Sequence, residues 1–270
     1  MAVPGRGGGE TAAGTCAPSA ARVYDYLLGG RDNSAADREL AQRLADPAQG
    51  GYAGLADLAR QNRRFILAAV QRLAGIDGIG QFLDLGCGVT PGAPLHQVAR
   101  GSVPGARVAY VDNDPIVISH MGSLARGGVA VTGGDLTDPE AVLTAVRKAG
   151  VIDLSRPAGV IFGAVLSLAD AGTARTVVAG YAGALAPGSA IVISAAHFGD
   201  EALARRLESM CPAARWRNHS PADVESMFGD LRLMRGLVAD VQRWPMLPDG
   251  DERPARIIGG VGFKRPAPRA

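Results

Sequence analysis

The sequence predicts an α/β fold in which a doubly wound, mostly parallel sheet is closed by an antiparallel edge. Short β-rich runs alternate with helical periods through the middle of the chain, which is typical of a parallel sheet covered on both faces. A glycine-rich turn follows the first of these runs, and the last two β-rich runs lack a helix-length gap between them. Consecutive strands without a crossover must be antiparallel.

The parallel strands are expected at residues 81–85, 107–111, 129–132, 159–162 and 190–193. A helix is expected over residues 53–73, because large apolar residues recur there on one side at helical spacing. Another is expected over residues 170–185, before a Pro-Gly pair. Asp114 is suited to cap a helix whose first residue is Pro115, since proline lacks an N–H that would be unsatisfied there.

The end of the chain departs from simple alternation. Residues 231–241 and 256–263 are both predicted strands, and residues 243–252 between them read as a turn-rich loop. Five parallel strands followed by an antiparallel pair make a seven-stranded sheet with an antiparallel last strand. A plain dinucleotide-binding fold does not require that ending.

The chain is predicted to divide into four segments. Residues 1–18 consist mainly of glycine, alanine and proline, so they are expected to form a disordered leader, and residues 265–270 a similar tail. Residues 19–75 are expected to form an N-terminal helical cap or lid. Residues 76–264 then form the ligand-binding domain.

Bulk composition narrows the function classes. The net charge of +2 is too small to indicate a nucleic-acid partner. No apolar run approaches the roughly 20 residues that span a bilayer, and the N-terminus lacks the apolar stretch of a secretory signal. The three cysteines are scattered, which favours a reducing cytoplasm over a disulfide framework. The sequence leaves the oligomeric state open.

The turn after the first predicted strand carries the main functional signal. Gly86 and Gly88 let backbone approach a ligand at the carboxyl edge of the sheet. The third glycine, Gly92, stands one place late for a dinucleotide fingerprint. Asp84 would repel a pyrophosphate but favours the α-ammonium and sulfonium of S-adenosylmethionine. A purely turn-forming role for Asp84 is the alternative.

Two further acids follow the next strands. Asp112, with its neighbour Asn113, is placed to accept both hydroxyls of a ribose, which supports a nucleoside ligand without identifying it. Asp135, followed by Leu136, could accept a hydrogen bond from an adenine amino group. Capping of the helix near Pro139 is the alternative role for Asp135, with nearly equal support.

The chain resembles a family of S-adenosylmethionine-dependent methyltransferases found mainly in actinobacteria, formerly a domain of unknown function. The resemblance covers residues 21–263, and its most specific part is the N-terminal stretch 21–33. The other matching segments are residues 62–65, 81–88, 110–115 and 185–189. It implies a Rossmann-like class I methyltransferase fold with S-adenosyl-L-methionine as cofactor.

The resemblance also implies a cofactor site that uses Asp84, Gly86, Gly88, Asp112 and Asp135. Relatives usually carry a histidine after the fourth strand and a Ser-His pair after the fifth. This chain has Ser167 at the first place and Ser194-Ala195 at the second, which puts an inherited catalytic histidine in doubt.

Two residues outside the strands join the predicted cofactor site. Tyr24 lies in a segment that a Gly-Gly pair interrupts, and this segment could close over the cofactor as a lid or pack as a small helix on the sheet edge. Arg63, on the helix before the first strand, could pair with the cofactor's carboxylate, or it could be a solvated helix arginine.

Methyl transfer from a sulfonium mainly requires alignment of the acceptor. If a base is needed, His197 after the fifth strand is the best placed, although a surface-loop histidine is the more common reading of such a residue. No metal site is predicted, because His96, His120 and His219 lack a partner pattern.

The predicted function is methyl transfer to an unidentified, small-molecule acceptor. A non-catalytic protein that binds S-adenosylmethionine or S-adenosylhomocysteine is an alternative, supported by the missing histidines. An NAD(P)-dependent oxidoreductase is the third reading, against which Asp84 and the displaced third glycine argue.

Overall fold

A computed structural model describes residues 17–211, 215–236, 238–245 and 254–265. The predicted leader and tail lie almost wholly outside these residues, as does most of the predicted loop 243–252. Among the described residues, no helix is both long enough and apolar enough to cross a membrane.

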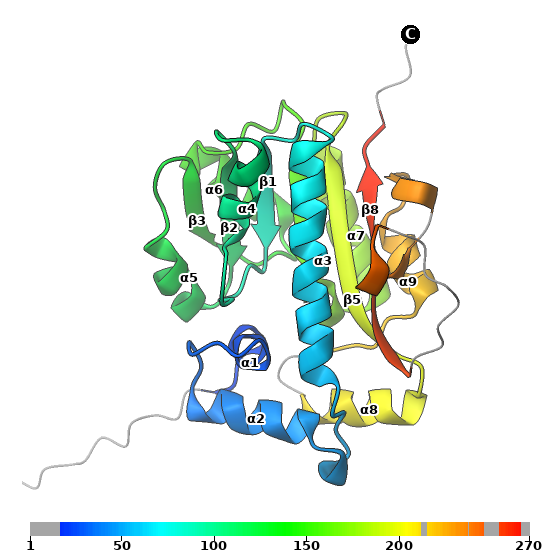
Figure 1. Ribbon diagram of the computed structural model, residues 1–270. Coiled ribbons are helices and arrows are strands. Elements are labelled where there is room, and N and C mark those ends of the chain that lie inside the picture. Colours follow the sequence, from blue (N-terminus) through cyan, green and yellow to red (C-terminus); the bar gives the residue numbers. More distant parts are fainter. Residues whose placement is uncertain (1–16, 212–214, 237, 246–253, 266–270) are drawn as a thin grey trace, which may run out of the picture.

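One eight-stranded sheet forms the centre of the molecule (Figure 1), with strand order β3-β2-β1-β4-β5-β8-β6 and β7 paired to β8. The five parallel strands lie where the sequence predicted them. Their bounds are β1 Gln81–Leu85, β2 Arg107–Asp112, β3 Val129–Gly133, β4 Gly159–Gly163 and β5 Ala190–Phe198. β8 (Ala255–Phe263) runs antiparallel to β5 over nine paired positions.

The prediction of one strand over residues 231–241 was wrong. The structure has two short strands there, β6 (Arg232–Leu233) and β7 (Ala239–Asp240), each antiparallel to β8. Arg235 and Gly236 between them both have positive φ, 55° and 74°. This left-handed backbone turns the chain away from the sheet edge, so pairing to β8 stops and then resumes.

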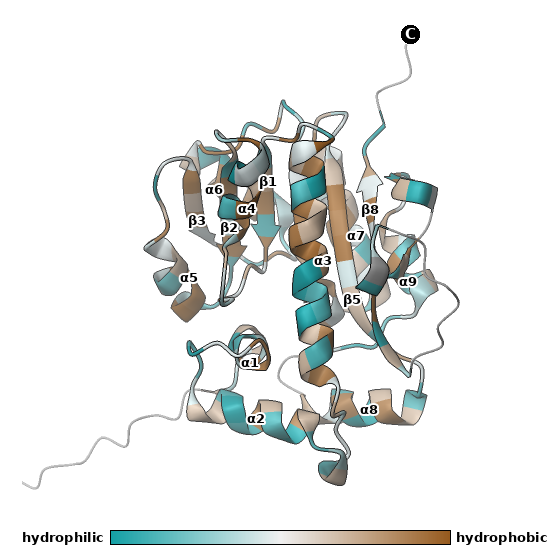
Figure 2. Ribbon diagram, viewed as in Figure 1, coloured by the Kyte–Doolittle hydropathy of each residue, from teal (hydrophilic) through white to brown (hydrophobic). Residues whose placement is uncertain are grey.

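Helices cover both faces of the sheet. One face packs against α3 (Leu55–Gly75), α4 (Leu95–Ser102), α5 (Pro115–Gly122) and α8 (Glu201–Met210), and the other against α6 (Pro139–Ala149), α7 (Ala171–Ala184) and α9 (Pro221–Met227). Residues alternate between the two cores along each strand, so Phe82 joins the first and Leu83 the second. Figure 2 shows the resulting apolar strands and the two-sided polarity of α3.

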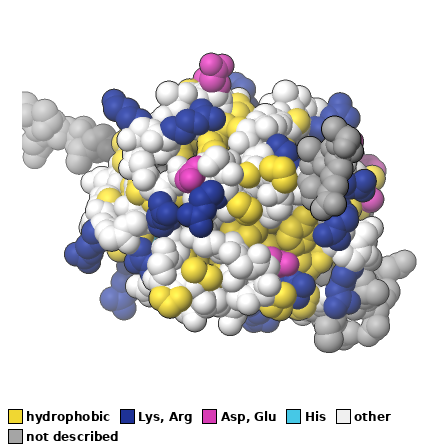
Figure 3. All heavy atoms as spheres, turned by 90° about the horizontal axis from the view of Figure 1, so that it is seen from above, with side chains coloured by type: hydrophobic (Ala, Val, Ile, Leu, Met, Phe, Trp, Pro, Cys, Tyr) yellow, Lys and Arg dark blue, Asp and Glu magenta, His cyan; other side chains and the backbone are white. Residues whose placement is uncertain are grey.

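Two N-terminal helices lie across the carboxyl ends of the parallel strands (Figure 1). They are α1 (Ala20–Leu27) and α2 (Ala35–Ala45), and α2 begins with a capping box between Ser34 and Asp37. These two helices therefore cover the carboxyl ends of the strands. The opposite end of the molecule, seen from above in Figure 3, carries lysine and arginine side chains spread over the face rather than gathered in one patch.

Candidate functional site

A cavity of about 580 Å³ lies between the carboxyl ends of the parallel strands and the N-terminal helices. Loops after β1, β2, β3 and β4 form one end of it, and α1, α2, α3, α8 and the ends of β5 and β8 form the other. A smaller space of about 210 Å³ adjoins it beneath the loop after β1. Arg63, Asp84, Cys87 and Thr90 line both spaces.

The turn after β1 brings bare backbone to the cavity. Gly86 and Gly88 have φ values of 63° and 56°, a left-handed conformation that favours glycine. A Cβ at Gly86 would lie 2.5 Å from Cγ1 of Val165, in the loop after β4. Both glycines line the cavity, so a side chain at either position would displace a ligand or a neighbouring loop.

Asp84, the fourth residue of β1, is a buried carboxylate with no hydrogen-bond or ion-pair partner among the described residues. Only 7% of the residue is exposed, and burial raises the pKa of its carboxyl to about 6, with Arg63 opposing the shift and Asp112 adding to it. A buried charge without a partner is unfavourable. The Asp84 carboxylate is therefore suited to a cation from outside the chain.

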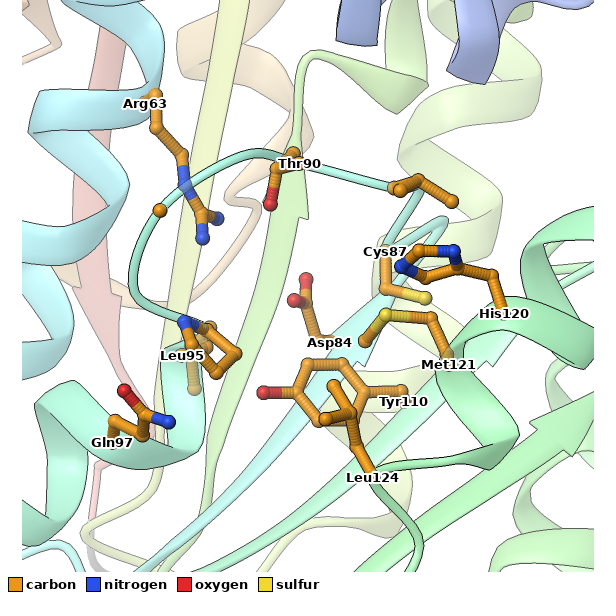
Figure 4. Close-up of a pocket in the computed structure, with 13 residues that line it drawn as sticks. Arg63, Asp84, Cys87, Thr90, Leu95, Gln97, Tyr110, His120, Met121 and Leu124 are labelled. Carbon is orange, nitrogen blue, oxygen red and sulfur yellow. The ribbon is translucent and has the colours of Figure 1, made fainter. Parts of the chain in front are cut away.

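Figure 4 shows how Asp84 and Arg63 lie relative to each other. Both side chains point into the space beneath the loop after β1, with the ring of Tyr110 on the far side of the carboxylate. One nitrogen of Arg63 donates to the carbonyl of Ala93 at 3.0 Å, while its buried Nε has no partner. Carboxylate and guanidinium thus present opposite charges to one small volume.

Asp112, at the end of β2, is fixed by two backbone N–H groups. Gly88 donates to its Oδ2 at 2.9 Å and Asp114 to its Oδ1 at 3.0 Å. Each carboxylate oxygen keeps a lone pair, so the group can still accept two hydroxyls. Asp114 caps α5 through Ile116, as the sequence predicted, and Asn113 lines the cavity beside them.

The structure does not bring Asp135 into the cavity. Its carboxylate accepts hydrogen bonds from the backbone and hydroxyl of Thr137, and only its neighbours Gly134 and Leu136 line the wall. The alternative role, capping of α6, is wrong as well, because Asp138 caps that helix. In the short turn before α6, the Asp135 carboxylate bonds to Thr137, only two residues further along the chain.

Sequence reasoning missed a hydrogen-bonded chain that links three elements behind the cavity. The hydroxyl of Tyr24 donates to the carbonyl of Ala59 at 3.0 Å and accepts from the amide of Asn62 at 2.9 Å. Ser194 donates to Oδ1 of Asn62 at 2.6 Å, and its hydroxyl accepts from the N–H of Ala164. Burial raises the pKa of Tyr24 to about 12, so its hydroxyl stays protonated.

This chain of hydrogen bonds connects α1, α3 and β5 to the loop after β4. Ala164 in that loop is a non-glycine residue with φ of 63°, and it lines the cavity together with Tyr24 and Asn62. A strained backbone of this kind persists only where its surroundings over-determine it. Asn62, which the sequence offered only as part of a matching segment, is the central link.

The N-terminal stretch is held by two buried charged residues that sequence reasoning also missed. Arg22 pairs with Asp37 at 2.9 Å and with Asp114 at 2.7 Å. Asp25 accepts from the backbone of Asp32 and the amide of Asn33. A Cβ at Gly30 would collide with the Asp25 carboxylate, which explains why a glycine follows Gly29. The segment is a docked helix that also covers the cavity.

His197 is not among the residues that line the cavity. Ala196 and Phe198 line it, so the alternation of β5 directs His197 to the other face, where its Nδ1 donates to the carbonyl of His219 at 3.0 Å. Burial lowers its pKa. Ser167 is buried with no partner for its hydroxyl and does not line the cavity either. The geometry does not support His197 as a base there.

The donor set fits a cationic nucleoside better than a metal or a dinucleotide. Within the described part of the chain, no group of three or more His, Cys, Asp or Glu residues could hold a metal ion. The carboxylate of Asp84 would repel a pyrophosphate and could accept from an ammonium. The guanidinium of Arg63 could donate to a carboxylate, and Asp112 could accept from hydroxyls.

Comparison with known proteins identifies relatives of this chain. A family model described as S-adenosyl methyltransferase matches residues 9–265. The crystal structure of a candidate methyltransferase from Thermobifida fusca is 34% identical, covers 93% of this chain and 96% of its own, and has a TM-score of 0.82. A DUF574 family protein from Streptomyces avermitilis is 29% identical, covers 92% and 98%, and has the same TM-score of 0.82. No curated protein matches significantly.

Proposed function

The chain belongs to the S-adenosyl methyltransferase family, whose cofactor is S-adenosyl-L-methionine, and we propose that it transfers the cofactor's methyl group to a small-molecule acceptor. The observation that carries the proposal is the unpartnered, buried carboxylate of Asp84 at the end of β1, beside backbone held open by Gly86 and Gly88. A ligand that supplies an ammonium there removes the penalty of the buried charge.

Different residues bind different parts of the cofactor. Asp84 binds the α-ammonium and Arg63 the α-carboxylate, which explains why two opposite charges face one small space. Asp112 binds the ribose hydroxyls, while Asn113, Gly134 and Leu136 lie along the wall that would receive the adenine. Gly86 and Gly88 give the ligand room against the backbone, and Tyr24 closes the cavity from α1. Asp135 stays outside this set, because its neighbours Gly134 and Leu136 line the cavity but Asp135 itself does not.

The bound cofactor supplies an activated methyl group on a sulfonium. In the transfer, a lone pair of the acceptor forms a bond to the methyl carbon as the carbon–sulfur bond breaks, leaving a neutral thioether. A protonated acceptor then releases its proton to water. The protein's contribution is alignment, through the loop after β4 that Ser194 and Asn62 hold in place.

No histidine lines the larger cavity among the described residues, and the acids that line it lie at or next to the strand ends assigned to the cofactor. His120 lines only the smaller adjoining space, into which Arg63 and Asp84 point. This arrangement suits an acceptor that is nucleophilic without a protein base. A cavity of about 580 Å³ falls within the range typical of small-molecule sites, about 300–1,000 Å³.

Calorimetry with S-adenosylmethionine, S-adenosylhomocysteine and NADPH tests the cofactor site. We expect both adenosyl ligands to bind and NADPH not to bind, and an Asp84→Ala variant to lose at least tenfold in affinity for the adenosyl ligands. Tight binding of NADPH with no binding of S-adenosylmethionine would refute the proposal.

A non-catalytic protein that binds the same cofactor is the second candidate, favoured by the lack of a histidine in the described cavity wall. Turnover on a panel of small-molecule acceptors, followed by the appearance of S-adenosylhomocysteine, separates the two. Asp84→Ala is the control for enzyme-dependent product. Product formation that requires Asp84 establishes the enzyme, and its absence over a broad panel at saturating cofactor favours the binding protein.

A further inference from the structure

One part of the cavity is lined mainly by apolar side chains, and we call it the apolar chamber. Its walls come from α1, α2, α3, α8, β5 and β8, and the side chains that form them are almost all large and apolar. The principal ones are Leu27, Leu44, Leu58, Phe198, Met210 and Trp216. None of these residues belongs to the set assigned to the cofactor, so this part of the wall is available to a second molecule.

The chamber and the proposed cofactor site are parts of one continuous cavity. Tyr24 and Asn62 line the cavity between the two ends, and Leu58 lies one helical turn before Asn62 on α3. A ligand in the chamber therefore lies next to the strand-end loops. Continuity of this kind is what a methyl acceptor needs, because the reacting atoms must approach in line.

Arg43 is the one charged side chain in the part of the wall that these apolar residues form, among the described residues. It lies in the last turn of α2, is exposed, and has no hydrogen-bond or ion-pair partner in the described structure. The thiol of Cys211, also in this wall, has a pKa raised by burial, with Arg43 opposing the shift. Among ionisable groups the chamber thus offers a cation and no anion.

We propose that this chamber binds the methyl acceptor, and that the acceptor is an apolar small molecule with one acidic group that pairs with Arg43. This inference rests on the proposed function and specifies its substrate class. Apolar area in the chamber supplies most of the affinity, because burial of apolar surface is the main driving force of such binding. Arg43 fixes which end of the molecule points away from the cofactor.

Two fluorescent probes of similar shape test the proposal. 8-Anilinonaphthalene-1-sulfonate is apolar with one acidic group, and N-phenyl-1-naphthylamine has the same aromatic body without the charge. We expect both to bind with one site per chain. Arg43→Gln should weaken the sulfonate probe about three- to fivefold at low salt and leave the neutral probe unchanged, since an exposed charge pair contributes modestly.

Two further variants complete the test. Arg64→Gln removes an exposed arginine of α3 that does not line the cavity, so it should change neither probe. Met210→Glu places a carboxylate on the apolar wall of α8 and should weaken both probes at least tenfold. Calorimetry with S-adenosylhomocysteine on the same samples should give an unchanged Kd, and circular dichroism should give an unchanged spectrum.

The outcomes separate this inference from the proposed function. Normal binding of S-adenosylhomocysteine without a saturable probe site would overturn the assignment of the chamber as the acceptor site, and would leave the proposed function standing. If Arg43→Gln lowers the affinity for both probes equally, or for neither, the proposal that the acceptor carries an acidic group is wrong. Probe binding that Met210→Glu does not weaken would place the probes elsewhere and overturn the assignment. Failure to bind S-adenosylhomocysteine at all would refute the proposed function first.

Discussion

The guanidinium of Arg22 lies 2.7 Å from the carboxylate of Asp114, although 92 residues separate them in the chain. Arg22 belongs to α1 and Asp114 caps α5 directly after Asp112. The contact therefore ties the N-terminal helices to the loop that we assign to the cofactor ribose. Its partner on the other side, Asp37, is fully buried.

Replacement of Arg22 by Met is expected to destabilise the protein by about 3 kcal/mol, because it leaves the buried Asp37 without its cation. We also expect faster proteolysis within the N-terminal helices and weaker binding of S-adenosylhomocysteine. Urea unfolding, limited proteolysis and calorimetry measure these effects. Arg60→Met is the matched control, since the Arg60–Asp57 pair is exposed and contributes at most about 0.5 kcal/mol. Equal effects of the two variants would contradict the assigned role of Arg22.

Binding of S-adenosylhomocysteine is expected to weaken as the pH falls through 6. The pKa of Asp84 is raised to about 6, chiefly by burial, so below this pH the carboxyl is protonated and cannot pair with the ammonium. Protonation of one such group makes Kd about tenfold weaker at pH 5 than at pH 7.5. Calorimetry in buffers of different ionisation enthalpy should detect proton release on binding below pH 6.

The Asp84→Asn variant is the control for that pH dependence. It should bind more weakly at pH 7.5 and lose the change in Kd between pH 5 and 7.5. The stability of the ligand-free protein should change with pH in the opposite direction. A carboxyl whose folded pKa is raised binds more protons in the native state, so its contribution to stability falls as the pH rises from about 4 to 6. A Kd that changes equally in both proteins would show that another group titrates.

Gly86→Ala should reduce both stability and cofactor affinity. The left-handed backbone alone costs alanine about 1–2 kcal/mol, and the new Cβ would press on Val165 in the loop after β4. Thermal unfolding and calorimetry measure the two effects. Gly101→Ala is the matched control: Gly101 lies in α4 with open space around it, so alanine should stabilise by up to about 1 kcal/mol. A neutral Gly86→Ala would show that the turn adapts.

Ser194→Ala should destabilise the protein by about 1–3 kcal/mol, because the buried Oδ1 of Asn62 loses its donor. The N–H of Ala164 loses the hydroxyl but keeps the backbone carbonyl of Ser194 as acceptor. Ser194→Thr, which keeps the hydroxyl, should retain more stability than alanine if the added methyl group fits. A double-mutant cycle with Tyr24→Phe is expected to show coupling of at least about 0.5 kcal/mol, since both residues bond to Asn62. Additive effects in urea unfolding would mean that the hydrogen-bonded chain does not act as a unit.

Much of the fold was readable from local sequence. Alternating β-rich runs placed all five parallel strands, Asp114 and Pro115 marked the start of α5, and the N-terminal stretch pointed to the family that the comparisons confirm. The same reasoning overestimated the strand at 231–241, because β propensity carries no information about the left-handed turn at Arg235.

The sequence by itself determined where the two acids of the proposed cofactor site lie: one before the glycine turn and one at the end of the second strand. Strand ends, glycines and caps follow rules that act over a few residues, so they are visible in a short window. Only the tertiary structure decided that Arg22 reaches Asp114, that Ser194 meets Asn62, and that His197 faces away from the cavity. These depend on strand register and helix docking, which join residues far apart in the chain and leave no local pattern.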